Sequence, residues 1–394
     1  MSITDGAPYD SDEEQEGEEV FLDDDDVIQE IPVDDEDLPD RDDSDVEEEE
    51  EEVDDSLFVF RNHTDEVYAV ACSPIDEGLV ATGGKDDRGF LWRIGSETPL
   101  LELQGHGDTV STLAFSPDGQ LLASGSFDGT ILVWNLQSGS KIVSLEGSGG
   151  SVEWLKWHPR GQLILTGSED ASVYLWNAEK GVMLNTFSGH GSSVTCGDFT
   201  PDGKTVCTGS DDASLRIWNP RTGQSIHAVK GHPYHTDGLT CLSITSDSTV
   251  AITGSKDGSV HMVNITTGRV VGSLMSHSSS VECIGLSRSG PWCATGGMDQ
   301  KLIIWDLQHS SVRCTCDHEE GVTCLLWLGA SKYIATGCVD GKVRVWDSLS
   351  GNCLRIFSGH TDVVQSLAVL KDGKSIISVS SDGTARLFGI SEFQ

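Results

Sequence analysis

The chain has 394 residues and a formal net charge of −39, which is distributed very unevenly. Residues 1–55 hold 29 of the 64 acidic residues and a single basic residue, Arg41, whereas the remainder has a net charge of only −11. Neither part has the basic surface that contacts with nucleic-acid phosphates require, so we expect no direct nucleic-acid binding and favour basic proteins as partners. No apolar run is long enough to span a membrane and no secretory signal is recognisable, which predicts a protein of the cytoplasm, and also of the nucleus.

The first predicted element is a disordered acidic tail, residues 1–55. Its runs of Asp and Glu, including Asp23 to Asp26 and Glu47 to Glu52, bury too little apolar surface to fold. We therefore place the start of the folded domain at residue 56.

Residues 56–394 repeat with a period near 42 residues. An Asp followed six residues later by a bulky apolar residue occurs eight times, and successive aspartates lie 42, 42, 42, 45, 42, 41 and 42 residues apart. The pairs are Asp86 and Trp92, Asp128 and Trp134, Asp170 and Trp176, Asp212 and Trp218, Asp257 and Val263, Asp299 and Trp305, Asp340 and Trp346, and Asp382 and Phe388. This is the period of a four-stranded WD40 blade, so the sequence predicts an all-β, eight-bladed WD40 β-propeller.

A histidine precedes most of these aspartates by 22 residues. The histidines are His106, His190, His277, His318 and His360, with His63 at 23 residues and His232 at 25, while the third repeat has Ser148 instead. The arrangement resembles the WD40 pattern in which a loop His, a strand hydroxyl, a turn Asp and a Trp form a buried hydrogen-bond chain. We assign the hydroxyls to Ser126, Ser168, Ser210 and Ser255. Because these residues recur from blade to blade, we interpret them as structural and not catalytic, and the tryptophans as core residues.

The two ends of the repeat region indicate how the ring closes. The last repeat stops at Phe388, on its third strand, and its fourth strand must come from elsewhere. The apolar segment from Leu57 to Arg61 precedes the first repeat and lacks a blade of its own. We expect this segment to complete the last blade, which removes both sheet edges. Ser148, Val263 and Phe388 depart from the repeat and are expected to weaken blades three, five and eight locally.

Departures from the repeat point to one acidic face. In a WD40 blade the His loop and the Asp turn emerge on the same side, which we call the top face. The acidic residues expected there are Asp65, Glu66, Asp108, Glu153, Glu169, Asp211, Asp237, Glu282, Glu319, Glu320 and Asp362. Only Lys85 and Lys256 oppose them, so the top face would attract a Lys- or Arg-rich peptide. The alternative is an ordinary set of solvated loops.

Aromatic residues on the same side are candidate anchors for a partner. Trp154 occupies a first-strand position that is filled in the other repeats by Ala, Thr, Cys or Ser. It either fills a gap in the core or offers an aromatic surface at the mouth of the central channel, and we include it among the partner-binding residues. Tyr68, Phe127 and Tyr234 are also expected at the rim.

The sequence gives no sign of a metal, a cofactor or a catalytic centre. Several of the 11 cysteines lie inside apolar strands, and the spacing of Cys314 and Cys316 does not fit a zinc site. Phosphate-binding Gly-rich loops and nucleophile elbows are lacking. We therefore expect a monomeric binding protein without cofactors and not an enzyme.

Two segments make the resemblance more specific than WD40 in general. TGGKDDRGFLWR at residues 82–93 and VEWLKWHPR at residues 152–160 are not required by the repeat. Together with the acidic leader and eight blades, they resemble the angio-associated migratory cell protein family. This resemblance implies kinship with a fungal dedicated chaperone that holds the basic N-terminal segment of a new large-subunit ribosomal protein on the negatively charged top of its propeller. Animal members of the family are described mainly in cell migration and angiogenesis.

The leading hypothesis is therefore a chaperone or assembly factor for the large ribosomal subunit. It would bind a basic client segment at Asp65, Glu66, Tyr68, Asp108, Phe127, Glu153, Trp154, Glu169, Asp211, Glu282, Glu319, Glu320 and Asp362. The alternatives are a signalling or cell-migration scaffold and a substrate receptor of a ubiquitin ligase. Receptors of that ligase class usually carry Trp-Asp-x-Arg, and here Trp305-Asp306 and Trp346-Asp347 lack the Arg.

Overall fold

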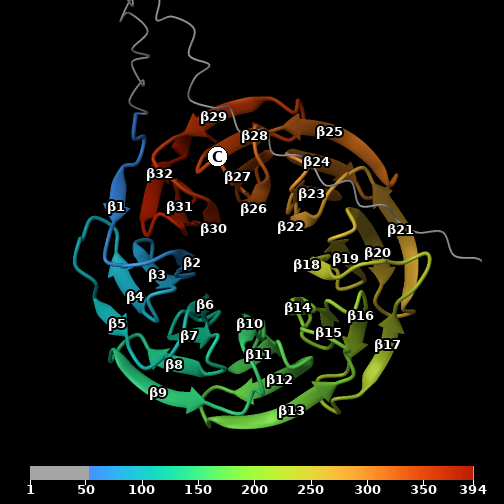
Figure 1. Cartoon of the computed structure of the whole chain (residues 1–394), viewed down its shortest axis with the longest axis horizontal. Coiled ribbons are helices and arrows are strands. Elements are labelled where there is room, and N and C mark those ends of the chain that lie inside the picture. The colour runs from blue at the N-terminus through green and yellow to red at the C-terminus, as the bar shows by residue number, and fades with distance from the viewer. Residues whose placement is uncertain (1–52, 394) are drawn as a thin grey trace, which may run out of the picture. The chain divides into compact units, whose positions relative to one another are not determined.

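The computed structural model describes residues 53–393, and the predicted acidic tail lies outside them except for its last three residues. Within this range, 32 strands form eight antiparallel sheets of four strands each. The sheets are the blades of a ring around a common axis, as Figure 1 shows. The predicted all-β, eight-bladed propeller is confirmed.

Seven blades are built from consecutive strands. Blade 1 contains β2 (Val67–Cys72), β3 (Leu79–Gly84), β4 (Gly89–Arg93) and β5 (Leu101–Leu103). Blade 2 contains β6 (Val110–Phe115), β7 (Leu121–Ser126), β8 (Ile131–Asn135) and β9 (Ser140–Leu145). Blade 3 contains β10 (Val152–Trp157), β11 (Leu163–Ser168), β12 (Ser172–Asn177) and β13 (Val182–Ser188). Blade 4 contains β14 (Cys196–Phe199), β15 (Val206–Gly209), β16 (Leu215–Trp218) and β17 (Ser225–Val229).

The remaining consecutive blades follow the same order. Blade 5 contains β18 (Leu239–Ile244), β19 (Val250–Ser255), β20 (Ser259–Asn264) and β21 (Arg269–Met275). Blade 6 contains β22 (Val281–Leu286), β23 (Trp292–Gly297), β24 (Lys301–Asp306) and β25 (Ser311–Asp317). Blade 7 contains β26 (Val322–Trp327), β27 (Tyr333–Cys338), β28 (Val343–Asp347) and β29 (Cys353–Phe357).

Blade 8 joins the two ends of the ring. It contains β30 (Val364–Val369), β31 (Ser375–Ser380) and β32 (Ala385–Gly389), and its outer strand is β1 (Phe58–Phe60). Phe60 of β1 pairs with Ala385 and is fully buried, with its ring stacked on Trp92 of blade 1 at 4.5 Å. The predicted closure by an N-terminal strand is confirmed, and it removes the edge that blade 8 would otherwise expose. Asp55, which we had placed in the tail, donates its backbone N–H to Ser358 of blade 7.

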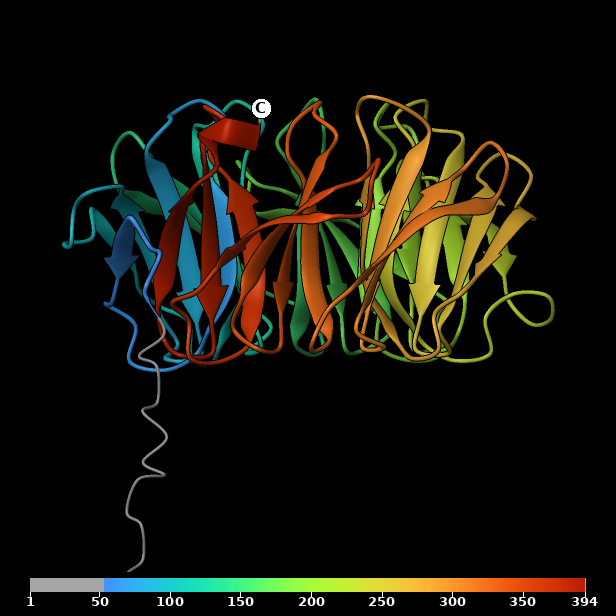
Figure 2. The ribbon, with the colours of Figure 1, turned by 90° about the horizontal axis from the view of Figure 1, so that it is seen from above.

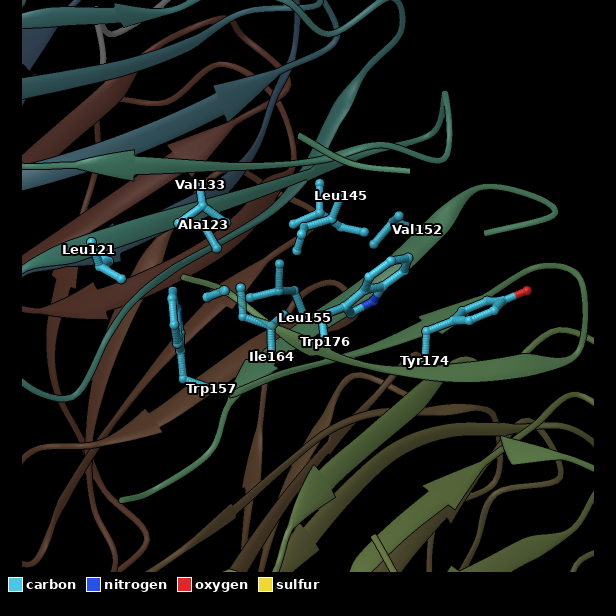
Figure 3. Packing of buried hydrophobic residues seen from close by; sticks show 12 residues of the cluster. Leu121, Ala123, Val133, Leu145, Val152, Leu155, Trp157, Ile164, Tyr174 and Trp176 are labelled. Carbon is cyan, nitrogen blue, oxygen red and sulfur yellow. The ribbon is translucent and has the colours of Figure 1, made fainter. Parts of the chain in front are cut away.

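The hydrophobic core lies between the blades. One cluster joins Leu121 and Val133 of blade 2 to Leu155, Ile164 and Trp176 of blade 3, as Figure 3 shows. Seven of the eight second strands have a Gly near their end, whereas β31 has Val379 at this position. In blade 2 the Gly permits the contact, since a Cβ on Gly125 would lie 2.8 Å from the Val152 side chain of the next blade. The repeated Gly-Ser pairs therefore serve the packing of neighbouring blades, in which even one added methyl group disturbs the fit.

The buried hydrogen-bond chain uses hydroxyls two residues before those assigned from the sequence. In blade 2, Nε2 of His106 lies 2.7 Å from the Ser124 hydroxyl, to which Trp134 also donates its indole N–H. The equivalent hydroxyls contacting His Nε2 belong to Thr82, Thr208, Thr253, Thr295, Thr336 and Ser378.

The assignment of Ser126, Ser168, Ser210 and Ser255 to this chain was therefore wrong. Ser126 instead donates to the backbone oxygen of Asp108 and accepts the backbone N–H of Asp128. Because side chains alternate between the faces of a strand, a hydroxyl two residues away lies on the same face but one step closer to the loop. The serines thus hold the loops of the top face.

The histidine of blade 5 also differs from the prediction. His235, and not His232, occupies the histidine position: its Nε2 lies 2.8 Å from the Thr253 hydroxyl and its Nδ1 is 3.6 Å from Asp257. The hydroxyl of Tyr234, which is 3% exposed, also contacts the Thr253 hydroxyl at 2.9 Å. That is the hydroxyl to which a Trp would donate, so Tyr234 takes over the role lost at Val263. Tyr234 is therefore a core residue, and its predicted place at the rim was wrong.

Candidate functional site

The strand register explains why the candidate residues gather at one end of the ring. In blade 1, Val67 at the start of the first strand pairs with Gly84 at the end of the second, so the loop before β2 and the turn after β3 are neighbours. Blades 2, 3, 5, 6, 7 and 8 repeat this register, and in blade 4 the pairing begins two residues later, at Cys196 and Gly209. All the predicted acidic residues lie in these loops and turns or at the start of a first strand. In Figure 2 this top face is the lower edge of the ring, and the 3-10 helix η1 (Ser391–Phe393) marks the opposite edge.

The predicted acidic residues of the top face differ in exposure. Those with exposed side chains are Asp65, Asp108, Glu169, Asp237, Glu319, Glu320 and Asp362. Those that are partly buried are Glu66, Glu153, Asp211 and Glu282.

Both lysines that we expected on the top face are engaged within it. Nζ of Lys85 lies 2.7 Å from Glu66, and Nζ of Lys256 lies 2.7 Å from Asp211. Tyr68 donates its hydroxyl to Glu66 at 2.9 Å. Tyr68 is therefore partly buried at the rim, and its hydroxyl is occupied by Glu66.

Three carboxylates from two blades interact electrostatically near the start of β10. Burial raises the pKa of Glu153, and the negative charges of Glu169 and Asp211 raise it further. Glu153 lies on β10, Glu169 in the turn after β11, and Asp211 in the corresponding turn of blade 4. Glu169 accepts a hydrogen bond from Ser151 at 3.0 Å, whereas Asp211 is bound to Lys256. The site therefore combines one partly desolvated carboxylate with two neighbours of the same charge.

Trp154 lies in the core and not on a surface. It is 8% exposed, and its indole N–H donates to the backbone oxygen of Val194 at 2.8 Å. The ring fills the space above Gly197 of blade 4, where a Cβ would lie 2.4 Å from it. The expected aromatic surface at the channel was therefore wrong. A signal was available: Gly197 stands where the first strands of the other repeats carry Val, Leu or Ile.

Phe127 is the aromatic rim residue with an exposed ring. Its side chain is 39% exposed, and it directly precedes the turn Asp128 of blade 2. Its backbone N–H donates to the Thr109 oxygen, which fixes it at the top face. Phe127 thus remains a candidate apolar contact.

Sequence reasoning missed the arginines on the third strands. Arg344 is 3% exposed and binds Asp340 of its own turn at 2.5 Å, with Glu319 at 3.5 Å. Burial alone would lower the pKa of Arg344, but the bond to Asp340 outweighs this effect and raises it. In blade 7 this ion pair replaces the His–Asp contact, since Nδ1 of His318 contacts the backbone oxygen of Cys316 instead. The charge of Glu319 is therefore partly neutralised by Arg344.

The cysteines and the other possible metal ligands of the described residues do not form a metal centre. Among residues 53–393, no group of three or more His, Cys, Asp or Glu side chains is arranged to hold a metal ion. Burial raises the pKa of Cys72, Cys196 and Cys324 to about 12, which keeps these thiols protonated. Within the same residues, no helix is long and apolar enough to cross a membrane.

The fold and its repeated hydrogen-bond chain define a WD40 propeller, a class of protein-binding platform that typically serves as a non-enzymatic scaffold. The chain belongs to the WD domain, G-beta repeat family, whose repeats match residues 54–93, 97–135, 139–177, 181–219, 223–264, 268–306, 309–347 and 351–388. Each matched segment contains the outer strand of one blade followed by the first three strands of the next blade.

A relative in sequence is the human angio-associated migratory cell protein. It is 40% identical over 68 residues, which cover 17% of this chain and 16% of the human protein. The match thus spans about a sixth of that relative's length. The resemblance predicted from the sequence is supported over this part.

Solved structures with the same fold include two fungal proteins named Sqt1. Sqt1 of Chaetomium thermophilum, in a crystal structure with the N-terminus of the ribosomal protein L10, has a TM-score of 0.80 and 24% identity, and the match covers 86% of this chain and 100% of that one. Sqt1 of Saccharomyces cerevisiae has a TM-score of 0.78 and 24% identity, over 86% of this chain and 99% of that one. These matches establish the shared fold.

Proposed function

We propose that this protein is a chaperone or assembly factor that binds the basic N-terminal segment of a large-subunit ribosomal protein on its top face. The observation that carries the proposal is the gathering of Glu153, Glu169 and Asp211 where blades 3 and 4 meet. The structure of fungal Sqt1 with the N-terminus of ribosomal protein L10 supplies the class of client. We also propose that the protein acts as a monomer in the cytoplasm and the nucleus.

The electrostatics of the three carboxylates favour a cationic client. A glutamate whose pKa is raised by burial and by like charges is costly to keep ionised. An Arg or Lys side chain placed among the three would relieve the repulsion and stabilise the ionised form. Lys85 binds Glu66 and Lys256 binds Asp211. These two lysines form no ion pair with the other nine of the eleven predicted acidic residues. Such a surface speeds the encounter with a basic peptide.

The proposal is tested by titrating the full-length protein with a labelled peptide that has the N-terminal sequence of ribosomal protein L10 from the same organism. The test variant combines Glu153→Gln, Glu169→Gln and Asp211→Asn. We expect the variant to bind at least about tenfold more weakly, since it removes three charges from one contact region. Binding of the wild-type protein should also fall steeply between low and high salt.

The matched control combines Glu77→Gln, Glu97→Gln and Glu179→Gln. These three exposed residues lie in loops at the opposite end of the blades, so the control has the same change in net charge. It should bind the peptide nearly as well as the wild type. Equal affinity of the two triple variants, or affinity that does not depend on salt, would contradict a client site on the top face.

A signalling or cell-migration scaffold is the second candidate. It is favoured by the local similarity to the angio-associated migratory cell protein. A scaffold of that kind would bind its partners with the top-face triple variant as well as with the wild type, and would not bind the ribosomal peptide. A ubiquitin-ligase receptor would in addition copurify with a ligase adaptor.

A further inference from the structure

Two segments on opposite sides of the ring have the same sequence. Residues 187–190 and residues 357–360 both read Phe-Ser-Gly-His, and in both cases an arginine lies 27 residues after the glycine. The first pair is Gly189 and Arg216, at the boundary of blades 3 and 4. The second is Gly359 and Arg386, at the boundary of blades 7 and 8. Figure 1 shows β13 and β16 across the ring from β29 and β32.

At each of these two boundaries the glycine and the arginine border an open space, which we call the notch. The notch at blade 8, between Gly359 and Arg386, is filled by an acidic segment of the chain itself. Arg386 donates from Nη1 to the carboxylate of Asp54, which lies directly above Gly359. Asp55, the next residue, exchanges hydrogen bonds with the backbone of Ser358: its N–H donates to the Ser358 oxygen at 2.9 Å, and its carboxylate accepts the Ser358 N–H at 3.0 Å. An extended pair of aspartates therefore occupies this notch.

The notch at blade 4 has the same shape around its arginine. A Cβ on Gly189 would lie 2.8 Å from Nη1 of Arg216, and a Cβ on Gly359 would lie at the same 2.8 Å from Nη1 of Arg386. Both glycines have a positive φ, 153° and 150°. Only a residue without a side chain leaves this space above the guanidinium open. Ser188 and Gly189 are exposed, so the opening faces solvent.

Arg216 nevertheless has no acidic partner among residues 53–393. Its Nε is buried without a hydrogen bond, and the contact of its guanidinium is with the Trp218 ring at 5.7 Å. The arginines at the same strand position of blades 7 and 8 bind Asp340 and Asp54. A carboxylate is the group that best satisfies a guanidinium, and at blade 8 the carboxylate of Asp54 is bound by Nη1, the atom that faces the glycine in both places.

We propose that Gly189 and Arg216, together with the backbone of Ser188, form a binding notch for an extended acidic segment of a partner protein. The segment would carry adjacent aspartates, as Asp54 and Asp55 do at blade 8. This site is formed by the end of the outer strand β13 and by the third strand β16, and it takes an acidic ligand. The basic client is proposed to bind Glu153, Glu169 and Asp211, which lie on the first strand β10 and in the turns after β11 and β15. The protein thereby joins two partners of opposite charge.

One difference between the notches sets the specificity. At blade 8, Arg355 lies 3.7 Å from Asp55 and adds a second positive charge. Its counterpart at blade 4 is Asn185, whose side-chain amide donates to the Pro220 oxygen at 2.7 Å. The first aspartate of the ligand, which meets Arg216, should therefore matter more than the second.

The test uses the full-length protein and a fluorescent peptide with the sequence Glu-Val-Asp-Asp-Ser-Leu, that of residues 52–57. Fluorescence anisotropy at low salt measures its binding to the wild type, to Arg216→Gln and to Arg221→Gln. Arg221 is exposed at the opposite end of blade 4 and serves as the matched control. We expect Arg216→Gln to weaken binding at least about tenfold and Arg221→Gln to leave it unchanged. A peptide with Asn in place of its first Asp should lose binding in the same way.

The proposal is overturned if the wild type does not bind the peptide at millimolar concentration, or if Arg216→Gln binds it as well as the wild type does. Arg216 would then serve only to cover Trp218. Thermal unfolding of each variant establishes that it is folded. Arg216→Lys gives a second readout that keeps the charge but loses the planar two-donor geometry, and we expect it to bind between the wild type and the Gln variant.

Discussion

The hydroxyl of Tyr174 donates a hydrogen bond to the carboxylate of Asp170 in the one blade whose loop carries Ser148 at the histidine position. The same carboxylate accepts the backbone N–H of Gly149 at 2.7 Å, so the loop and the turn remain joined. Burial alone would raise the pKa of Asp170, but the bonds from Tyr174 and Gly149 outweigh it and lower the pKa. Blade 3 thus replaces an imidazole with a phenol that reaches the turn from the third strand.

Replacing Tyr174 with Phe removes this bond and leaves the ring in place. We expect the free energy of unfolding to fall by about 1–3 kcal/mol, because a partly buried carboxylate loses a donor. Urea unfolding followed by tryptophan fluorescence measures the change. Tyr68→Phe is the control, since its hydroxyl binds the partly exposed Glu66, and it should cost less than about 1 kcal/mol. Equal losses in the two variants would contradict a linking role for Tyr174.

Trp154→Ala tests the core position of the indole. Removing a buried Trp leaves a cavity above Gly197, and we expect a loss of about 3–5 kcal/mol in the free energy of unfolding. Phe127→Ala, at an exposed aromatic on the same face, should change it by about 0.5 kcal/mol or less. A mild effect of Trp154→Ala would restore the interpretation of an aromatic surface.

Phe60→Ala tests the closure of the ring. The Phe60 ring is fully buried and stacks on Trp92, so its removal should cost about 3–5 kcal/mol and expose the edge of β32. Leu57→Ala, three residues earlier with a side chain that is 68% exposed, is the matched control and should have little effect. Chemical unfolding gives the energies, and hydrogen exchange at the β32 amides reports on the opening. Faster exchange confined to other blades would argue against the role of β1.

Acid should destabilise the propeller through its buried histidines. Burial lowers the pKa of His106, His235 and His318 to about 4, whereas the same side chains titrate near 6.5 when unfolded. Between these values the unfolded chain binds protons that the folded chain excludes, so stability falls as the pH drops from about 6.5 to about 4. Each histidine accounts for at most about 3.5 kcal/mol at about 1.4 kcal/mol per pKa unit.

Urea midpoints measured across this range test the pH prediction. His106→Gln cannot titrate, and its stability should depend less steeply on pH than that of the wild type. The matching substitution at His309 is the control variant, since the ring of His309 is open to solvent and binds Asp306 in an exposed ion pair. A wild-type midpoint that stays constant from pH 7 to pH 4.5 would contradict the burial of neutral imidazoles.

The number of blades and the closing strand were predictable because each depends on a local pattern. The spacing of Asp and Trp recurs within every blade, and β1 is an apolar strand adjacent in sequence to the first repeat. The histidine of blade 5 was not predictable in this way. His232 and His235 both lie in a loop lengthened by three residues, and the path of the backbone through that loop selects His235.

The predicted acidic residues lie in the loops and turns at one end of the strands or at the start of a first strand, because the strand register fixes them there, while an acidic top face stays a prediction. The interactions among these acidic residues were not predictable from the sequence. Glu153, for example, interacts with Asp211, which lies nearly 60 residues further along the chain. The partners of the third-strand arginines were not predictable from the sequence either. Whether a third-strand arginine binds its own turn, as Arg344 does, or a distant segment, as Arg386 does, depends on what lies across the blade boundary.

The sequence specified the class of fold, the eight repeats and the closure of the ring, and it predicted at which ends of the strands the candidate partner-binding residues lie. It did so because strand alternation and turn chemistry act over a few residues and recur at each period. Which side chains are exposed on the top face depends on the tertiary structure. Trp154 is buried because Gly197 of the next blade makes room for it, and Arg216 stays without an acidic partner because no aspartate of residues 53–393 reaches it. Both outcomes depend on contacts between blades, which no single repeat encodes.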